Sequence, residues 1–403
     1  MAIYVQGLSA LAYYRNGGSA TDVERVSARI RSLKNATSSR TEIVDSGIWR
    51  LGIGEPTEER PFEVLLRDAG QRTRSRAVRA KIWPSPLAPP SFRKAYKNIY
   101  ISSPEFAFLQ MATRLELPEL IALGMEFCGT YRRNVELPRI DGSGITLTTA
   151  YQQPPLSNLR RLHGYIGSMK SAPGQQKALK ALEYVLPDSA SPMETALYLL
   201  LCLPRRLGGY ALPKPVLNPA IFLSESGRKF TLNNSAKPDL YWSDARLDLE
   251  YNSDEFHGED RRAISSMRRK ALERMRVEVI GLTPDELFSV ELFHATAVRI
   301  AHQLGRRIRS EREGTFIKMR VALRQMLLFD DSTAPPHSEE DAPDGQEERT
   351  SVYQNRHDAA ELQEESIWLD GAPDSELWSE EAWDASGTWE IDSIEHDDED
   401  INT

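Results

Sequence analysis

The sequence predicts a mixed α/β protein of the α+β type, with helices and short strands along most of the chain. Ser191-Pro192-Met193-Glu194 caps a helix that runs to 203, and an apolar stripe at helical spacing predicts another helix over 259–274. Apolar and polar residues alternate strictly over 240–242 and 247–251, which is typical of two paired strands. Since 403 residues are too many for one ordinary core, we expect two or three domains.

The charge of the chain is divided between two regions. The whole chain carries −9, but residues 331–403 hold 24 acidic and 2 basic residues, so that segment carries −22. Residues 1–330 therefore carry +13. A basic body favours a polyanionic partner, because phosphates that are neutralised by Lys and Arg release counterions. A merely well-solvated surface is the alternative.

The acidic segment 331–403 is predicted to be a disordered tail, since it combines high charge with little apolar surface that could cluster. Four of the seven tryptophans lie there: Trp368, Trp378, Trp383 and Trp389. One hypothesis is that the tail mimics nucleic acid and contacts the basic body of the same chain. The other is that it only keeps the protein soluble.

Cysteine content and hydropathy exclude several classes of protein. The two cysteines, Cys128 and Cys202, lie in apolar settings and indicate neither a disulfide framework nor a zinc cluster. The N-terminus lacks the pattern of a secretory signal, and no run of ~18 apolar residues occurs. These features predict a cytoplasmic protein without a membrane partner.

The predicted organisation has five parts. Residues 1–150 form an N-terminal α+β domain, with helices over 8–15 and 21–33, strands over 62–66, 77–83 and 98–101, and helices from 104 and 118. A turn-rich stretch, 130–155, marks its end. Residues 151–187 form a helical bridge, 188–290 a second α/β domain, 291–330 C-terminal helices, and 331–403 the acidic tail.

A cationic row lies in the first domain: Arg72, Arg74, Arg76, Arg79 and Lys81. Such a row suits a phosphate backbone, but it is also typical of an edge strand that charge protects from aggregation.

The hairpin over 237–252 carries the most specific pattern in the chain. A four-residue turn, 243–246, puts the apolar residues of both strands on one face, and a slip of one residue would undo this. The same register puts Asp239 opposite Glu250, and Lys237 opposite Asn252. Two carboxylates then lie close together and repel each other, and binding of a cation such as Mg²⁺ is the usual way to offset this repulsion. A shared proton or plain solvent is the alternative.

Pro238-Asp239 followed by Glu250-Tyr251-Asn252 resembles the PD-(D/E)XK nuclease signature, with asparagine in place of its lysine. The following Asp254, Phe256 and His257, the Arg-rich helix and the strand at 277–280 resemble the very-short-patch-repair-like endonuclease branch. Residues 77–115 also resemble the region before nuclease-like domains in proteins related to abortive-infection antitoxins.

The resemblance covers roughly residues 188–290 and implies a restriction-endonuclease-like αβββαβ core. It also implies a metal-dependent DNA endonuclease that hydrolyses phosphodiester bonds in a defence or mobile-element setting. The alternative is a catalytically inactive nucleic-acid-binding protein, or an antitoxin-like regulatory protein.

The resemblance further implies roles for individual residues. Asp239 and Glu250 would hold Mg²⁺, or Mn²⁺, with Asp239 bridging to the scissile phosphate and Glu250 orienting the attacking water. Glu194 lies where related nucleases carry an auxiliary acidic ligand, although a capping box with Ser191 explains it as well.

The missing lysine has two candidate substitutes. Asn252 occupies the position of that lysine and offers a neutral hydrogen bond. Lys237 lies opposite Asn252 in the predicted register, and His257 lies where the resemblance puts a histidine that acts as base or acid.

The helix over 259–274 is predicted to have a basic face and an apolar stripe. The stripe, which we expect in the core, consists of Ile264, Met267, Ala271 and Met275. The basic face would bind nucleic acid, or simply be solvated, and consists of Arg261, Arg262, Arg268, Arg269 and Lys270. Arg269 also matches the family's arginine.

Overall fold

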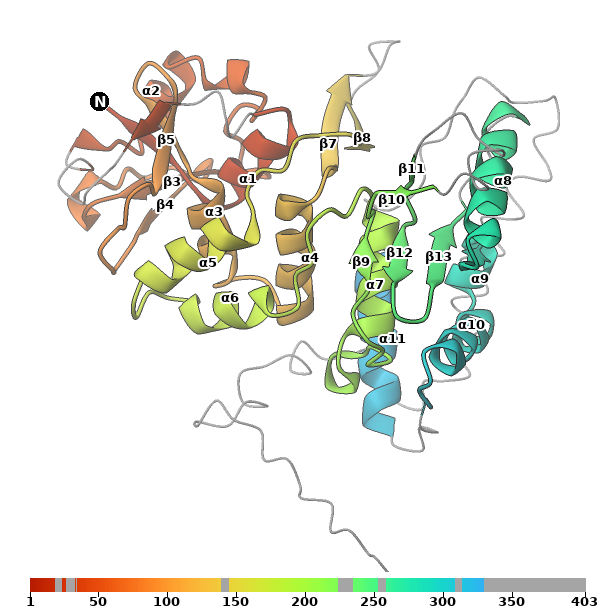
Figure 1. The fold of residues 1–403 in the computed structure, drawn as a ribbon. Coiled ribbons are helices and arrows are strands. Elements are labelled where there is room, and N and C mark those ends of the chain that lie inside the picture. Colours follow the sequence, from red (N-terminus) through yellow and green to blue (C-terminus); the bar gives the residue numbers. More distant parts are fainter. Residues whose placement is uncertain are drawn as a thin grey trace, which may run out of the picture. The chain divides into compact units, whose positions relative to one another are not determined.

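The computed structural model describes residues 1–18, 24–26, 33, 35–138, 145–223, 235–252, 259–308 and 314–329. The chain divides into two units, residues 1–340 and residues 341–403. The described residues all belong to the first unit and form a mixed α/β fold with eleven α-helices and several sheets, as predicted (Figure 1). The acidic tail lies outside the described residues, so its disorder stays a prediction.

The N-terminal part is built on a six-stranded sheet in the order β2-β5-β6-β1-β3-β4. Its strands are β1 (Ile3–Val5), β2 (Glu24–Val26), β3 (Phe62–Leu66), β4 (Val78–Ile82), β5 (Phe92–Tyr96) and β6 (Ile99–Ser102). The central β1 is parallel to β6 and antiparallel to β3, and β4 forms one edge (Figure 1). Its helices are α1 (Gly7–Arg15), α2 (Arg40–Asp45), α3 (Pro104–Met111) and α4 (Leu117–Cys128).

Two features of this sheet differ from the prediction. The helix expected over 21–33 is wrong where the structure describes it, since residues 24–26 form β2 and pair with β5. Strands β1 and β5 were not predicted. Residues 3–5 are buried throughout, so they show no alternation, and β5 includes the buried Arg93, whose guanidinium lies 3.8 Å from Glu105 Oε2.

A hairpin and three helices follow the N-terminal sheet. The hairpin consists of β7 (Arg132–Pro138) and β8 (Ile145–Ala150), within the stretch that was predicted to be turn-rich. Helices α5 (Leu159–Ser168) and α6 (Gln175–Leu182) lie in the predicted helical bridge, and α7 (Pro192–Cys202) is the capped helix predicted over 191–203. Helix α7 packs against α4 and α11 (Gly314–Leu328), and almost all of its residues are buried.

The second main sheet has four strands in the order β14-β13-β12-β9. These are β9 (Val216–Leu217), β12 (Leu240–Trp242), β13 (Leu247–Tyr251) and β14 (Glu278–Leu282). A separate pair consists of β10 (Ile221–Phe222) and β11 (Ser235–Ala236). Helix α8 (Glu259–Arg274) connects β13 to β14, which lie parallel. The order of helix, strands, hairpin, helix and strand matches the prediction for 188–290.

Helix α8 packs on the four-stranded sheet through a stripe that differs in part from the predicted one. Ala271 and Leu272 are buried with Val279, and Met275 packs beside them. Met267 was expected in the core, but it is 50% exposed. The side chain of Ile264 lies outside the described residues.

The C-terminal helices of the first unit are α9 (Pro284–Phe288), α10 (Val290–Gln303) and α11. Buried Arg324 of α11 donates to the carbonyl of Leu287 at 2.8 Å, which ties α11 to α9. Within the part of the chain that the structure describes, no helix has the length and hydrophobicity to cross a membrane.

Candidate functional site

The predicted register of the β12–β13 hairpin is confirmed. Leu240 pairs with Leu249 and Trp242 with Leu247, so the turn consists of residues 243–246. Asp239 directly precedes β12, and its Oδ2 accepts a hydrogen bond from the backbone N–H of Tyr251 at 2.9 Å. The carboxyl group of Asp239 therefore lies at the end of β13, next to Glu250.

A third carboxylate, Asp248, lies on the same face of β13 as Glu250, because alternate residues of a strand share a face. Asp248 is 0% exposed and Glu250 is 4% exposed. The acidic face of β13 is thus buried, although strict alternation of apolar and polar residues is typical of a strand with one exposed face. The same period of two that located Glu250 would have located Asp248, but the cover over this face was not foreseen.

Glu194 joins the cluster from the first turn of α7. Ser191 Oγ accepts from its backbone N–H at 3.1 Å, which is one half of the predicted capping box. The Glu194 carboxylate does not complete the box: its Oε2 accepts from the backbone N–H of Ala190 at 2.8 Å and from Asn218 Nδ2 at 2.5 Å. These two hydrogen bonds fix the position of this carboxylate.

Asn218 links Glu194 to Asp239 and was missed from the sequence. Its backbone N–H donates to the carbonyl of Asp239 at 3.1 Å, while its side chain holds Glu194. Its φ of +48° is in the left-handed region, which asparagine tolerates better than most residues. Asn218 is followed by a proline after β9, and this turn signal would have marked the position.

One arginine faces these carboxylates. Arg268 Nη2 lies 3.0 Å from Glu250 Oε1, and the charge of Arg268 also acts on Glu194, Asp239 and Asp248. Burial works against the charge of Arg268, but the carboxylates outweigh it and raise the pKa of Arg268. Arg268 was predicted to bind nucleic acid, and the structure pairs it with Glu250.

The site holds more negative charge than one arginine can balance. Burial raises the pKa of Asp239 to about 7, and the charge of Glu194 adds to this. Burial raises the pKa of Asp248 to about 9, with further contributions from Glu250 and Asp239. Burial also raises the pKa of Glu194. At neutral pH this cluster therefore favours uptake of protons or of a cation.

Replacing Asp248 with asparagine is expected to raise the free energy of unfolding at pH 8 by about 2 kcal/mol. A carboxyl group whose pKa is raised binds its proton in the native state, so stability falls as pH rises from 3.8 to about 9. Asparagine does not titrate, so this decline becomes shallower. Urea denaturation from pH 5 to pH 9 measures the effect, and exposed Asp244→Asn in the hairpin turn is the control. Parallel curves for wild type and Asp248→Asn would contradict the assignment.

The other predicted residues are distributed as follows. The backbone N–H of Asn252 donates to the carbonyl of Leu282 at 2.9 Å, which places Asn252 beside Gly281 at the end of the sheet. Lys237 is exposed, and the β12–β13 pairing ends at Leu240, so its pairing with Asn252 stays a prediction.

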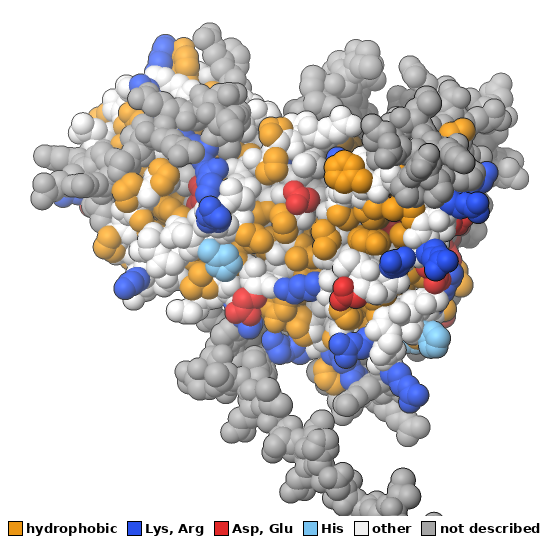
Figure 2. Space-filling view, in the orientation of Figure 1, with side chains coloured by type: hydrophobic (Ala, Val, Ile, Leu, Met, Phe, Trp, Pro, Cys, Tyr) orange, Lys and Arg blue, Asp and Glu red, His pale blue; other side chains and the backbone are white. Residues whose placement is uncertain are grey.

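The basic residues of α8 divide between the sheet and solvent. Arg269 Nη2 donates to the carbonyl of Val279 at 3.2 Å, and Lys270 is exposed. Figure 2 shows several Lys and Arg side chains on the side where α8 to α10 lie. His257 and the side chains of Arg261 and Arg262 lie outside the described residues.

The carboxylates are ligands of the type that a divalent cation prefers, but the described side chains do not form a coordination site. Carboxylate oxygens are the ligands that Mg²⁺ and Mn²⁺ prefer. Neither side-chain oxygen of Asp248 accepts a hydrogen bond from a described residue, although both are buried. Within the described ranges, no three His, Cys, Asp or Glu side chains are arranged to hold a metal ion. Arg268 takes the place of a cation beside Glu250.

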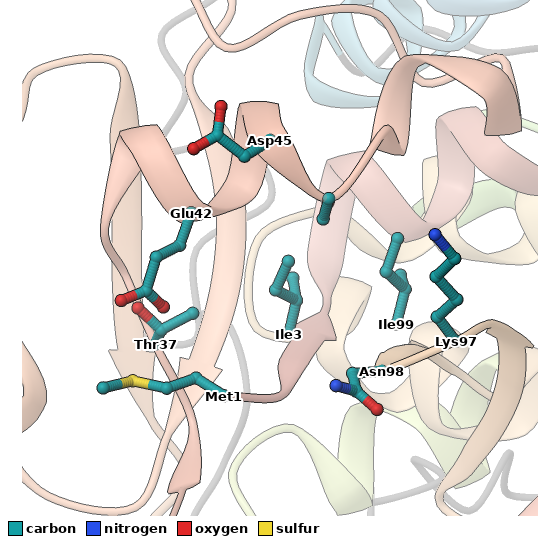
Figure 3. Close-up of a pocket in the computed structure, with 9 residues that line it drawn as sticks. Met1, Ile3, Thr37, Glu42, Asp45, Lys97, Asn98 and Ile99 are labelled. Carbon is teal, nitrogen blue, oxygen red and sulfur yellow. The ribbon is translucent and has the colours of Figure 1, made fainter.

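A pocket of about 360 Å³ lies elsewhere, in the N-terminal part. Figure 3 shows Glu42 and Asp45 of α2 on one side of it, with Ile3 of β1, Lys97 and neighbouring residues on the other. None of the residues predicted for the nuclease-like site lines this pocket. The candidate site is therefore identified by its buried carboxylates and not by this pocket.

No protein-family model, curated protein or solved structure matches this chain.

Proposed function

We propose that residues 188–290 form a restriction-endonuclease-like domain that hydrolyses phosphodiester bonds of DNA with Mg²⁺ or Mn²⁺. The observation that carries the proposal is the convergence of four carboxyl groups on one arginine, beside the β12–β13 hairpin that lies between α7 and α8. The basic charge of residues 1–330 supports a polyanionic substrate.

Asp239, Glu250 and Glu194 are the residues that would hold the cation, and the charges of Glu250 and Asp239 also act on Asp248. A bound divalent cation neutralises charge on the phosphate and lowers the pKa of a bound water. Asn218 and the backbone N–H of Tyr251 keep the carboxylates of Glu194 and Asp239 in place. Asn252, beside Gly281, offers a neutral hydrogen-bond donor at the edge of this group.

A second candidate function is a nuclease-like protein that binds nucleic acid without cleaving it, including an antitoxin-like regulator. The ion pair between Arg268 and Glu250 favours this alternative, because it occupies a carboxylate that the enzyme would need. The asparagine at position 252 favours it too, because a neutral amide stabilises developing negative charge less than a lysine does.

The two functions are separated by measuring cleavage and binding on the same labelled DNA duplex. Wild-type protein is incubated with the duplex in Mg²⁺, in Mn²⁺ and in EDTA, and binding is followed by fluorescence anisotropy. The enzyme is expected to cleave in either metal and to bind without cleaving in EDTA. Binding without cleavage under all three conditions would select the inactive alternative.

Removing the acidic tail is expected to raise DNA affinity by about tenfold at low salt, if the tail contacts the basic body. The motivation is the charge of −22 in residues 331–403 beside +13 in residues 1–330. Anisotropy with the full chain and with residues 1–330 measures the difference, which should shrink as salt is added. Equal affinities at low salt would leave the tail with a solubilising role only.

A further inference from the structure

A second basic surface lies far along the chain from the carboxylate cluster, on edge strand β4 and the loop before it. Residues 67–81 include six basic residues and one acidic residue. All six basic residues are exposed, and we call the five from residue 72 onward the basic ridge: Arg72, Arg74, Arg76, Arg79 and Lys81.

The loop that carries the first part of the basic ridge is anchored to the body of the protein. The backbone N–H of Thr73 donates to Ser38 Oγ at 2.8 Å, and Thr73 Oγ1 donates to the carbonyl of Ser38 at 2.6 Å. Ser38 Oγ in turn donates to the carbonyl of Gln71 at 2.8 Å. Arg72 and Arg74 flank this anchor, so their backbone is fixed before any ligand binds.

The cations of the basic ridge have few partners within the residues that the structure describes. Arg76 pairs with Glu58 at 3.8 Å, but their side chains are 86% and 69% exposed, so this pair is weak. The side chains of the other four cations make no hydrogen bond or ion pair with described residues. Partial burial lowers the pKa of Lys81, and the nearby charge of Arg114 lowers it further.

Protection of an edge strand explains only part of this pattern. Charges on β4 would discourage pairing with another strand, and this accounts for Arg79 and Lys81. Arg72, Arg74 and Arg76 lie before β4, where the backbone forms no ladder that needs protection. A row that continues through an anchored loop is better explained by an extended anionic ligand.

We propose that the basic ridge binds the sugar–phosphate backbone of nucleic acid. Alternate residues of a strand are about 6.6 Å apart, close to twice the ~3.4 Å axial spacing of phosphates along one DNA strand. Arg79 and Lys81 have this separation in sequence, and the loop arginines extend the row. The proposal goes beyond the carboxylate site, because it holds whether or not the protein cleaves DNA.

The test replaces four cations together in the full-length protein: Arg72→Gln, Arg74→Gln, Arg79→Gln and Lys81→Gln. Binding of a labelled DNA duplex is measured by anisotropy in EDTA at several salt concentrations. The expected loss of affinity is roughly tenfold or more at ~0.1 M salt, because about four phosphate contacts disappear. The slope of log K against log salt should become shallower by about one per lost contact.

A control variant removes the same charge from other exposed positions: Arg160→Gln, Lys170→Gln, Arg306→Gln and Arg307→Gln. It should change the affinity much less than the ridge variant. A variant with Arg72→Lys, Arg74→Lys and Arg79→Lys should stay within about threefold of wild type, since it keeps the charge. Equal losses in the ridge and control variants would overturn the proposal. An unchanged affinity of the ridge variant would also overturn it.

Discussion

Replacing Asp239 with asparagine is expected to slow metal-dependent DNA cleavage by about 10³-fold, which corresponds to about 4 kcal/mol of transition-state stabilisation. Asparagine has the shape of aspartate, and its carbonyl can still accept the hydrogen bond from the Tyr251 N–H. What it removes is one negative oxygen donor next to Glu250. Single-turnover cleavage of a labelled duplex in Mg²⁺ measures the rate.

The same variant is expected to fold normally. Because burial and the charge of Glu194 already penalise the ionised form of Asp239, a neutral side chain relieves repulsion in the native state. Thermal unfolding at pH 8 should therefore show a midpoint no lower than that of wild type. Exposed Asp244→Asn, in the turn of the same hairpin, is the matched control and should cleave at the wild-type rate. A rate for Asp239→Asn within tenfold of wild type would contradict its role.

Replacing Arg268 with glutamine is expected to lower the free energy of unfolding by about 2–3 kcal/mol at pH 8 without metal. Glu250 would then be a buried carboxylate without its cation, beside Asp248 and Asp239. The value lies at the low end for broken buried pairs, because the Arg268 side chain is 34% exposed and water screens part of its charge. Urea denaturation measures the loss.

Millimolar Mg²⁺ should restore part of this stability, since a ligand that binds only the native state stabilises it by mass action. It should stabilise Arg268→Gln more than wild type, in which Arg268 competes for Glu250. Lys270→Gln changes an exposed cation on the same helix and should alter stability by less than about 0.5 kcal/mol. If Arg268→Gln and Lys270→Gln changed the free energy of unfolding equally, Arg268 would not be the counter-ion of the cluster.

The local order of elements in the second half of the chain could be predicted from sequence because local patterns determine it. Helix α7 follows from its cap signal and α8 from apolar spacing, and the turn at 243–246 follows from the parity of the flanking apolar residues. The position of Asp239 beside Glu250 follows from that register. These features depend on neighbours in sequence, or on partners a few residues away.

The features that were missed depend on contacts between distant segments. Burial of Asp248 requires that α8 covers the face on which it lies, and Arg268, the ion-pair partner of Glu250, comes from that same helix. Asn218 is significant only because it lies between Glu194 and Asp239. No local pattern carries this information.

The prediction of the N-terminal sheet was wrong for the same reason. Residues 24–26 lie in the segment 21–33, which was predicted to be a helix, yet they form β2 by pairing with β5, 66 or more residues away along the chain. Strand β1 is buried in the middle of the sheet and lacks the alternation by which half-buried strands are recognised. Tertiary pairing therefore overrode local propensity in both strands.

The central claim is that the buried carboxylate cluster is a metal-dependent nuclease site, and plasmid cleavage tests it most directly. Supercoiled plasmid is incubated in Mg²⁺ or Mn²⁺ with wild-type protein and, in parallel, with Glu250→Ala. The account predicts nicked or linear plasmid with wild type, none with Glu250→Ala, and none for either protein in EDTA. Equal cleavage by the two proteins, or no cleavage by wild type in either metal, would contradict it.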